Sequence, residues 1–369
     1  MDKVNLLDIC NPKQWKTLAT SELIVDGKYD VYGANGIIGK YDDYNHEKPT
    51  VLITCRGATC GNVHLSKPFS YINGNAMSLD NLDESRCLKE YLYYYLRGIN
   101  LSNSISGSAQ PQITIQGLKK INVNLYDIKQ QKQIVNILSK IENLITCKKD
   151  EIEKADQLIK SQFVEMFGDP ILNEKNWNKE KNKELCSKIG SGSTPKGGNS
   201  VYLNEGITFI RSMNVYDNAF EYKDLAFLDD RLANELKNVV VEKNDILLNI
   251  TGASVCRCCI VPHDLIPARV NQHVSILRYK TCNPVFILHQ FINDSFKYTL
   301  YKISKSGGAT REALTKTQLE DLELIYPPIE LQNEFADFVK LIDKQKFEFK
   351  NSLKKLEELQ ASLMQEYFG

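Results

Sequence analysis

The nine residues at 190–198, GSGSTPKGG, are of types that could surround a phosphate group. In the phosphate-binding loop of nucleotide-using enzymes, glycines and backbone N–H groups enclose the phosphates in the spacing G-x-x-x-x-G-K-[ST]. Counted from Gly190, Lys196 is in place, but Pro195 stands where the second glycine is required and Gly197 where the Mg²⁺-binding hydroxyl is required. Proline also lacks the N–H that such a loop uses. The run therefore gives little support to a nucleotide-using enzyme.

Cysteine and histidine could hold a metal ion at two equivalent places, each following a predicted strand. The two groups are Cys55, Cys60 and His64, and Cys256, Cys258, Cys259 and His263. Neither group has the paired C-x-x-C spacing of a zinc site, and the first offers only three ligands. We expect buried free thiols and no bound metal, with a zinc site as the open alternative.

Other catalytic patterns are missing from the sequence. A DNA-amino methyltransferase needs an [DNS]-P-P-[YFW] motif to hold the flipped base, whereas the only Pro-Pro lies in IYPPIE at 325–330 and matches the entry of a helix. The five histidines are scattered and suggest no Ser/His/Asp set. No strand carries the spaced carboxylates of a nuclease. We therefore predict a chain without catalytic residues and without a cofactor of its own.

Length and composition fit a globular protein of two or more domains. The chain has 369 residues, of which 42% are apolar and 25% charged. Ten unevenly placed cysteines do not form a disulfide framework, and neither a signal peptide nor a run of about 18 apolar residues is present, so we expect a cytoplasmic protein. Lys and Arg total 46, as do Asp and Glu. This balance neither indicates nor excludes nucleic acid, because binding depends on where charge is displayed.

An internal repeat is the strongest signal in the sequence. Residues 106–168 align without a gap with residues 307–369 at an offset of 201, so that Thr114 meets Thr315. The preceding regions repeat more loosely, with VLITCRG at 51–57 resembling ILLNITG at 246–252 and NGNAMSL at 73–79 resembling NQHVSIL at 271–277. The sequence therefore predicts a duplicated module, each copy a globular part followed by a helical part.

The globular parts mix strands and helices. Short apolar runs bounded by Gly, Asn and Pro predict strands at 50–54, 121–125, 245–250 and 273–277. EYLYYYLRGI at 90–99 and PVFILHQFIN at 284–293 predict helices at equivalent places in the two copies. The predicted fold class is α+β, with much irregular loop.

Long helices are predicted from about 129 to 167 and from about 330 to 367, because apolar residues recur every seven positions among charged ones. We expect these residues to pack the helices: Leu138, Ile145, Ile152, Ile159, Phe335, Ile342, Phe349, Leu356 and Leu363. Each helix has one poor heptad row where the other is rich, so we infer that the two helices pack on each other. The alternative is that each lies on its own globular neighbour. Unbroken, each would be roughly 55 Å long.

The ordered motifs resemble those of one known family, the specificity subunits of type I restriction–modification systems. The motifs are YDVYGANGIIGKYDDYN (29–45), ITCRGATCGNV (53–63), YINGNAMSL (71–79), GSAQPQITIQGL (107–118), SGSTPKGGN (191–199), FIRSMNV (209–215) and YPPIELQ (326–332). The resemblance covers nearly the whole chain, and the order and duplication of these motifs make it specific.

This resemblance implies two mixed α/β target-recognition domains separated by two long antiparallel coiled-coil helices, in a pseudo-twofold repeat. It places the first recognition domain at 1–125, the central spacer helix at 126–168, the second recognition domain at 169–326 and the C-terminal spacer helix at 327–369. Each domain would read half of a bipartite double-stranded DNA site, and the helices would set the spacer between the halves. The implied partners are two methyltransferase subunits and restriction motor–nuclease subunits. S-adenosylmethionine, ATP and Mg²⁺ would belong to those partners.

The residues that we predict to contact DNA are Arg, Lys, Asn and Gln in loops, because these types read base edges and neutralise phosphates. In the first copy they are Asn35, Arg56 and Gln110, with Lys13 and Lys40 for the backbone; in the second they are Lys196, Arg211 and Arg257, with Lys305 and Arg311. For any one of them, the alternative is a solvated surface side chain. Asn73 and Asn271 are predicted to be structural turn residues instead.

The front ends of the copies differ most, since DICNPKQWKT at 8–17 stands where ELCSKIGSGSTPKGG at 184–198 stands in the second. We therefore expect two different half-sites and an asymmetric target, with GSGSTPKGG as the opening loop of the second recognition domain. Two other functions stay open at this point. One is a single-chain restriction enzyme or methyltransferase, and the other is a duplicated scaffold that binds only protein.

Overall fold

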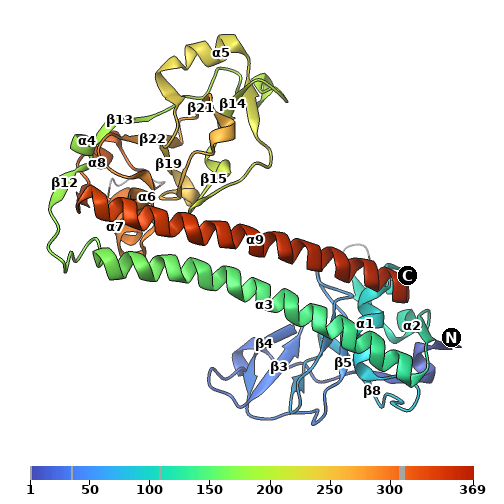
Figure 1. Ribbon diagram of the computed structural model, residues 1–369. Helices are drawn as coiled ribbons and strands as arrows, with labels where there is room; N and C mark the ends of the chain where they lie inside the picture. The colour runs from blue at the N-terminus through green and yellow to red at the C-terminus, as the bar shows by residue number, and fades with distance from the viewer. Residues whose placement is uncertain (1, 35, 108–109, 307–311) are drawn as a thin grey trace. The chain divides into compact units, whose positions relative to one another are not determined.

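The computed structural model describes residues 2–34, 36–107, 110–306 and 312–369 (Figure 1). It forms two compact units: the first comprises residues 1–150 and 349–369, and the second comprises residues 151–348. Two helices of 40 residues each, α3 (Ile128–Phe167) and α9 (Ile329–Phe368), cross the boundary, so that each unit contains one part of each helix. Both helices lie within one residue of the predicted bounds.

Two sheets organise the first unit. The larger has the order β2-β8-β5-β6 with antiparallel neighbours: β2 (Asn11–Gln14), β8 (Ala76–Asp80), β5 (Val51–Thr54) and β6 (Val63–Leu65). The smaller has the order β4-β3-β7: β4 (Gly36–Tyr41), β3 (Tyr29–Gly33) and β7 (Tyr71–Ile72), with β3 and β7 parallel. Strand β1 (Asp2–Asn5) pairs with β11 (Asn122–Leu125). Every residue of β5 is buried, as its continuous apolar run predicts.

Helix α1 (Lys89–Gly98) supplies the aromatic part of the core in the first unit. The ring of Phe368, near the end of α9, meets Tyr91 and Tyr95 of α1 edge to face at centroid distances of 5.6 and 5.5 Å. Leu138 of α3 is fully buried in the same core. Both long helices are therefore part of the core of this unit.

The second unit repeats the larger sheet. Its order is β13-β22-β19-β20: β13 (Cys186–Ser191), β22 (Val274–Tyr279), β19 (Ile246–Asn249) and β20 (Cys258–Ile260). A further sheet has the order β17-β14-β21-β18, made of β17 (Ala226–Leu228), β14 (Ile207–Ile210), β21 (Ala268–Val270) and β18 (Val240–Val241). As β3 does with β7, β14 runs parallel to β21. Strands β12 (Lys179–Lys181) and β23 (Glu323–Ile325) correspond to β1 and β11.

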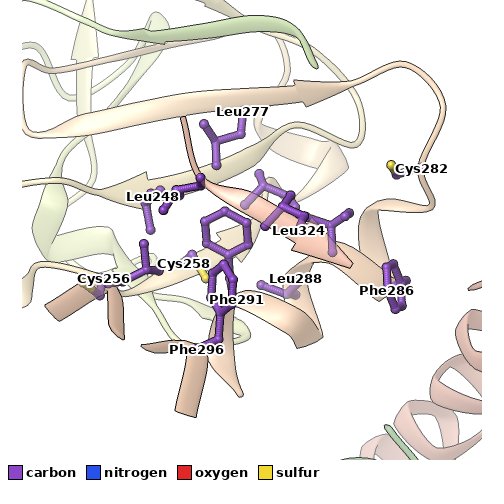
Figure 2. Packing of buried hydrophobic residues seen from close by; sticks show 14 of the residues in the cluster. Leu248, Cys256, Cys258, Leu277, Cys282, Phe286, Leu288, Phe291, Phe296 and Leu324 are labelled. Carbon is purple, nitrogen blue, oxygen red and sulfur yellow. The ribbon is translucent and has the colours of Figure 1, made fainter. Parts of the chain in front are cut away.

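Helices of the second unit cover one side of the β19–β22 pair, and the other side packs in a second apolar cluster. These helices are α6 (Pro284–Ile292) and α7 (Asp294–Lys305), and α6 occupies the place of α1. Figure 2 shows side chains from strands and helices converging, with Leu248 and Leu277 above Phe291 and Phe296. Phe163 of α3 and Phe335 of α9 join the same cluster.

The remaining elements are short. In the first unit, α2 (Ile115–Leu118) follows the hairpin of β9 (Ile105–Ser106) and β10 (Gln112–Ile113), and in the second unit α8 (Lys316–Glu320) is the counterpart of α2. The second unit also has α4 (Asn182–Leu185), α5 (Asp230–Glu235) and the hairpin of β15 (Val215–Tyr216) and β16 (Ala219–Phe220). The fold class is therefore the predicted one, mixed α/β with a pair of long helices.

The two long helices run antiparallel to each other within each unit. In the first, Lys148 of α3 lies 4.9 Å from the ring centroid of Phe349 in α9, and Lys149 pairs with Glu357 at 3.3 Å. In the second, Asp156 of α3 pairs with Lys346 of α9. Five of the nine predicted packing residues are buried, and Ile152, Phe349, Leu356 and Leu363 are half-buried. The helices thus pack on each other and, at their ends, on the globular parts. Both kinds of packing considered from the sequence, helix on helix and helix on globular neighbour, therefore occur.

One boundary predicted from the sequence is wrong. The sequence predicts that Gly190 and Ser191 lie in an opening loop, but they belong to β13 and pair with Ile276 and Ser275 of β22. The reason is that β13 carries glycine at an edge position, where a side chain is not needed for packing, and glycine is depleted in strands only statistically. The first unit has the corresponding strand, β2, so both front ends begin with an edge strand, although the residues in these strands differ.

Candidate nucleic-acid interface

A polar junction forms at the end of the central strand of each larger sheet. In the first unit, the residues after β5 meet the segment 111–113: Ile113 N–H donates to the Cys55 carbonyl at 3.0 Å and Gly57 N–H to the Pro111 carbonyl at 3.2 Å. Arg56 and Gln112 form an isolated β-bridge there. Backbone hydrogen bonds therefore hold Arg56 beside this segment.

The second unit builds the same junction after β19. Leu314 N–H donates to the Ile250 carbonyl at 2.8 Å, Gly252 N–H donates to the Glu312 carbonyl at 2.9 Å, and Thr251 bridges Ala313. Each of these bonds is the counterpart of one in the first unit. We call the two sites the Arg56 junction and the Thr251 junction.

Side chains at the Arg56 junction are of the types that read base edges. The exposed Arg56 lines a cavity of about 380 Å³ with Gln14, Gln112 and Gln116. Gln14 is fixed by donating to the Gly74 carbonyl at 3.0 Å. Gln110 is exposed and precedes Pro111 of the junction. Arginine and glutamine form bidentate hydrogen bonds with guanine and adenine, so this arrangement could contact a base pair directly.

The other predicted contacts of the first unit lie on different surfaces. Lys13 is exposed on β2, with its ammonium 3.6 Å from the ring centroid of Trp15. Because residues 13 and 14 alternate across the strand, Lys13 faces away from the junction that Gln14 lines. Lys40 is exposed on β4 in the smaller sheet. Asn35 lies outside the described residues.

At the Thr251 junction, the polar groups are fewer and smaller. The Thr251 hydroxyl lies 2.6 Å from Nδ1 of His273. Arg257 ends the loop that follows, and its carbonyl accepts from Asn249 N–H at 2.8 Å. The Arg257 guanidinium lies 4.6 Å from the ring centroid of Tyr216 in β15. The structure thus brings Arg257 near the junction, as its place in the sequence suggested, and adds an aromatic partner.

Arg211 is anchored inside its own unit. Its guanidinium donates to the Asp224 carbonyl and lies 5.5 Å from the ring centroid of Tyr202, and the side chain is half-buried. Its Nε is buried and has no hydrogen-bond partner among the described residues. These contacts orient the side chain and leave part of it for an external group.

Lys196, Lys305 and Arg311 complete the predicted set. Lys196 is exposed between the buried Pro195 and Gly197, whose φ of 105° is in the left-handed region. The turn that follows is a four-residue 3-10 helix, not the long helix that a phosphate-binding loop needs at its end. Lys305 is exposed at the end of α7. Arg311 lies outside the described residues.

Asn73 and Asn271 are structural, which confirms the prediction. Both are buried, and their N–H groups donate to equivalent carbonyls, those of Tyr32 at 2.9 Å and Ile210 at 3.0 Å. The Asn73 side chain also donates to the Leu18 carbonyl at 2.9 Å. The two backbone bonds extend the parallel pairs β3–β7 and β14–β21 by one residue each.

Most of the grouped cysteines are packed as apolar side chains. Cys55, Cys256, Cys258 and Cys259 are buried, whereas Cys60 is half-buried. Burial raises the pKa of Cys256 and of Cys259 to about 12, so both stay as neutral thiols. Within the ranges that the structure describes, no group of three or more His, Cys, Asp and Glu side chains is placed to hold a metal ion.

Several residues of these sites were missed in the sequence. The offset of 201 residues equates Gln112 with Ala313, and the loose repeat equates Arg56 with Thr251, so the alignment already pointed to the positions where the junctions differ. Gln14 and Tyr216 come from elements that only the fold brings near. In the described part of the chain, no helix is long and apolar enough to cross a membrane.

The fold and the two junctions define a class of protein, a duplicated binding module in which one framework carries two different sets of loop residues. The chain belongs to the family of the type I restriction modification DNA specificity domain, whose model matches residues 1–157 and again residues 174–361. Its fold and family are therefore those of a type I specificity subunit, as the motifs predicted.

Relatives agree with this assignment. The type I restriction enzyme MjaIX specificity subunit of Methanocaldococcus jannaschii is 25% identical over 326 residues, which are 81% of this chain and 73% of the relative. The EcoprrI specificity subunit of Escherichia coli is 29% identical over 116 residues, 31% of this chain and 28% of the relative.

Solved structures share the fold over the full chain. The S subunit of a type I restriction-modification system from M. genitalium superposes with a TM-score of 0.66 at 17% identity, covering 100% of this chain and 96% of that one. A chain from a type I R-M system whose complex assembly and conformational transition were studied gives a TM-score of 0.58 at 15% identity, covering 100% of this chain and 97% of that one.

Proposed function

We propose that this chain is the DNA-recognition subunit of a type I restriction–modification complex and that it reads a bipartite, asymmetric site. The observation that carries the proposal is the pair of junctions. Equivalent backbone hydrogen bonds build both, yet one presents Arg56 and Gln112 where the other presents Thr251 and Ala313. Because base readout depends on the donors and acceptors at such positions, two different sets favour two different half-sites.

Each copy of the sequence repeat would supply one recognition domain and one spacer helix. Residues 1–125 and 169–326 would form the two recognition domains, and residues 126–168 and 327–369 the spacer helices. A paired helix is stiff over many turns, which suits a device that fixes the distance between two DNA contacts. A rod of roughly 55 Å corresponds to one to two turns of DNA, since one turn is about 34 Å.

Partner subunits would supply the chemistry. The proposed partners are two methyltransferase subunits, which bring S-adenosylmethionine, and restriction motor–nuclease subunits, which use ATP and Mg²⁺. The long helices offer apolar surface for such docking, with Leu144, Leu158, Leu341, Phe347 and Leu359 exposed by 47 to 61%. The described junctions present arginine, glutamine, threonine and alanine, which are suited to binding and not to covalent catalysis.

Mapping methylated bases in a genome tests the proposal most directly. The chain is expressed with its methyltransferase partner in a host that has no other such system, and modified adenines are read by long-read sequencing. We expect one motif with two unlike halves and a fixed gap. A continuous motif, a palindromic motif or methylation by this chain without a partner would contradict the proposal. Equilibrium DNA titration of the complex at two salt concentrations excludes a protein-only scaffold if binding is sequence-specific.

Lengthening the helix pair tests the spacer role separately. One heptad is inserted into the 144–162 segment of α3 together with one in the 345–363 segment of α9, so that their facing residues stay in register. We expect a longer gap in the mapped motif and unchanged half-sites. Altered half-sites with the old gap would argue against a spacer function.

A further inference from the structure

Helix α7 of the second unit has an outward face made of tyrosine and lysine. Phe296, Leu300 and Ser304 are its buried residues and recur every four positions on one side. The opposite side carries Tyr298, Tyr301, Lys302 and Lys305, all exposed, with Tyr298 exposed by 60%. An exposed helix face normally mixes acidic and basic residues, and this one has no carboxylate within it. We call these four residues the Tyr–Lys face.

Each lysine of this face is placed on a ring one turn away. The ammonium groups of Lys302 and Lys305 lie 4.4 Å from the ring centroids of Tyr298 and Tyr301, respectively. A free lysine side chain loses rotamer entropy when a ligand orders it. Contact with a ring restricts the side chain before the ligand arrives, so less entropy is lost on binding.

Other contacts tie α7 to the proposed DNA-reading region of the same unit. Lys297 pairs with Asp217 in the turn between β15 and β16, next to Tyr216, on which Arg257 lies. At the other end, Ala313 N–H of the Thr251 junction donates to the Ser304 carbonyl at 3.0 Å. Three carboxylates interact with residues of α7 or belong to it. Asp294 is the first residue of α7, lies on the same side of the helix one turn before Tyr298, and pairs with Lys160. Asp217 pairs with Lys297, and Glu312 acts on Lys305.

The first unit has a different arrangement at this place. There, α1 is followed by a single 3-10 turn at Ser102–Ser104, and the described residues of that unit contain no helix equivalent to α7. In the described ranges of the chain, the Tyr–Lys face is therefore a feature of the second unit.

We propose that the Tyr–Lys face of α7 binds the phosphate backbone of double-stranded DNA beside the half-site read by the second unit. The inference rests on the proposed function. Lys302 and Lys305 are about 4.5 Å apart along the helix axis, which lets them reach neighbouring phosphates of one strand. Tyrosine hydroxyls can donate to phosphate oxygens as well. The face strengthens binding without regard to base sequence, and the unit that bridges threonine and alanine at its junction gains affinity from it.

A double variant of the full chain in its methyltransferase complex tests this inference. Lys302→Gln with Lys305→Gln is compared with wild type on a duplex carrying the mapped site and on a duplex with that site scrambled. We expect affinity to fall about tenfold on both duplexes, and the slope of log K against log salt to decrease by about two, because two phosphate contacts are lost. The methylated motif should stay the same.

The matched control is Lys237→Gln with Lys243→Gln, two exposed lysines of the same unit. We expect this control to keep the wild-type affinity and salt slope. If both double variants lose affinity equally, net charge and not this face is responsible, and the inference fails. It also fails if Lys302→Gln with Lys305→Gln leaves affinity and salt slope unchanged, as for a face that meets an acidic protein instead. If wild type itself shows no sequence-specific binding, the proposed function fails instead.

Discussion

The two units differ least where helix meets globular part. Gln131 and Gln332, the fourth residue of α3 and of α9, are both fully buried. The side-chain carbonyl of Gln131 accepts from Leu88 N–H at 2.9 Å, and that of Gln332 accepts from Asn283 N–H at 2.9 Å. Each side chain also donates to a carbonyl just before its helix, at 2.8 Å. The same buried polar anchor thus stands at the entry of both helices.

The units differ most in the side chains at the two junctions. The backbone bonds of the Arg56 and Thr251 junctions correspond one to one, but the side chains do not. Among the residues that the structure describes, α7 of the second unit has no counterpart in the first. The comparison teaches that the framework is under one set of physical constraints, burial and hydrogen-bond satisfaction, in both copies. The side chains of the loop residues are not required for burial or for internal hydrogen bonds, so they can differ between the two units.

Among the tests of this comparison, exchange of a whole recognition domain should have the largest effect on the methylated motif. Residues 1–125 are replaced by the corresponding segment of a family member with a different target, leaving both helices in place. We expect one half of the methylated motif to be replaced completely, with the other half and the gap unchanged, because each domain has its own sheets and core. Mapping of methylated sites reads the result. A change in both halves would show that the domains do not read independently.

Loss of a buried anchor should be the next largest effect. In Gln332→Leu, the Asn283 N–H and the Pro327 carbonyl lose their partner in an apolar setting, at a cost of about 1–3 kcal/mol each. We expect the free energy of unfolding of the affected unit to fall by about 2–6 kcal/mol, measured by hydrogen exchange and denaturant titration. Gln131→Leu should cost somewhat more, because the Gln131 side chain also donates to the Arg86 carbonyl at 2.8 Å. The control is Gln130→Leu, at an exposed neighbour. If one variant lost far more free energy of unfolding than the other, the two anchors would not stabilise their units equally.

Truncation of a single junction residue should have a smaller and local effect. Arg56→Ala removes a five-donor side chain from the first junction, which is worth about 1–3 kcal/mol of base discrimination, or roughly 5- to 150-fold in affinity. We expect the loss to be confined to base changes in one half-site, measured by competition with singly substituted duplexes. Thr251→Ala is the partner experiment and should affect the other half more weakly. Lys40→Ala should weaken binding to all sequences alike. Relaxed specificity in both halves after Arg56→Ala would contradict the assignment.

Much of this fold could be predicted from the sequence. The heptad pattern gave both long helices to within one residue, and the repeat gave the equivalent strands, because period and burial are local properties of the chain. β5 and β19 were predicted as strands from continuous apolar runs, and each is buried at every residue.

The junctions could be predicted only in part. Arg56 and Arg257 were chosen by residue type and loop position, but Gln14 reaches the first junction from a strand 41 positions away from Cys55, whose sulfur accepts from it at 2.9 Å. Likewise, the tyrosines that orient Arg257 and Lys305 have no signature of their own in the sequence. Contacts between distant segments depend on sheet order, and a single sequence does not encode that order in any short pattern.

At one pair of equivalent positions the two units carry opposite charges, and we expect the smallest effect there. Asp80 at the end of β8 and Arg278 in β22 occupy equivalent positions in the loose repeat. Asp80 pairs with His46 at 3.0 Å, whereas Arg278 pairs with the buried Asp245 at 2.8 Å. The first pair joins a carboxylate to an imidazole, which is charged only when protonated, whereas the second joins a carboxylate to a guanidinium. The hydrogen bond to Asp245 raises the pKa of Arg278, which stays charged throughout.

Acid should weaken the pair of Asp80 and His46 in the first unit. Burial raises the pKa of the Asp80 carboxyl, but hydrogen bonds from His46 and Ser78 outweigh burial and hold that pKa below its usual value. A carboxylate of this kind stabilises the folded state above the usual aspartate pKa of about 3.9, and the stabilisation is lost as pH falls through the lower, folded value. We expect Asp80→Asn to reduce stability near neutral pH by on the order of 1 kcal/mol and to flatten the acid side of the stability curve. Exposed Asp26→Asn is the control. An acid dependence of Asp80→Asn identical to wild type would show that this carboxylate is no part of the difference between the two units.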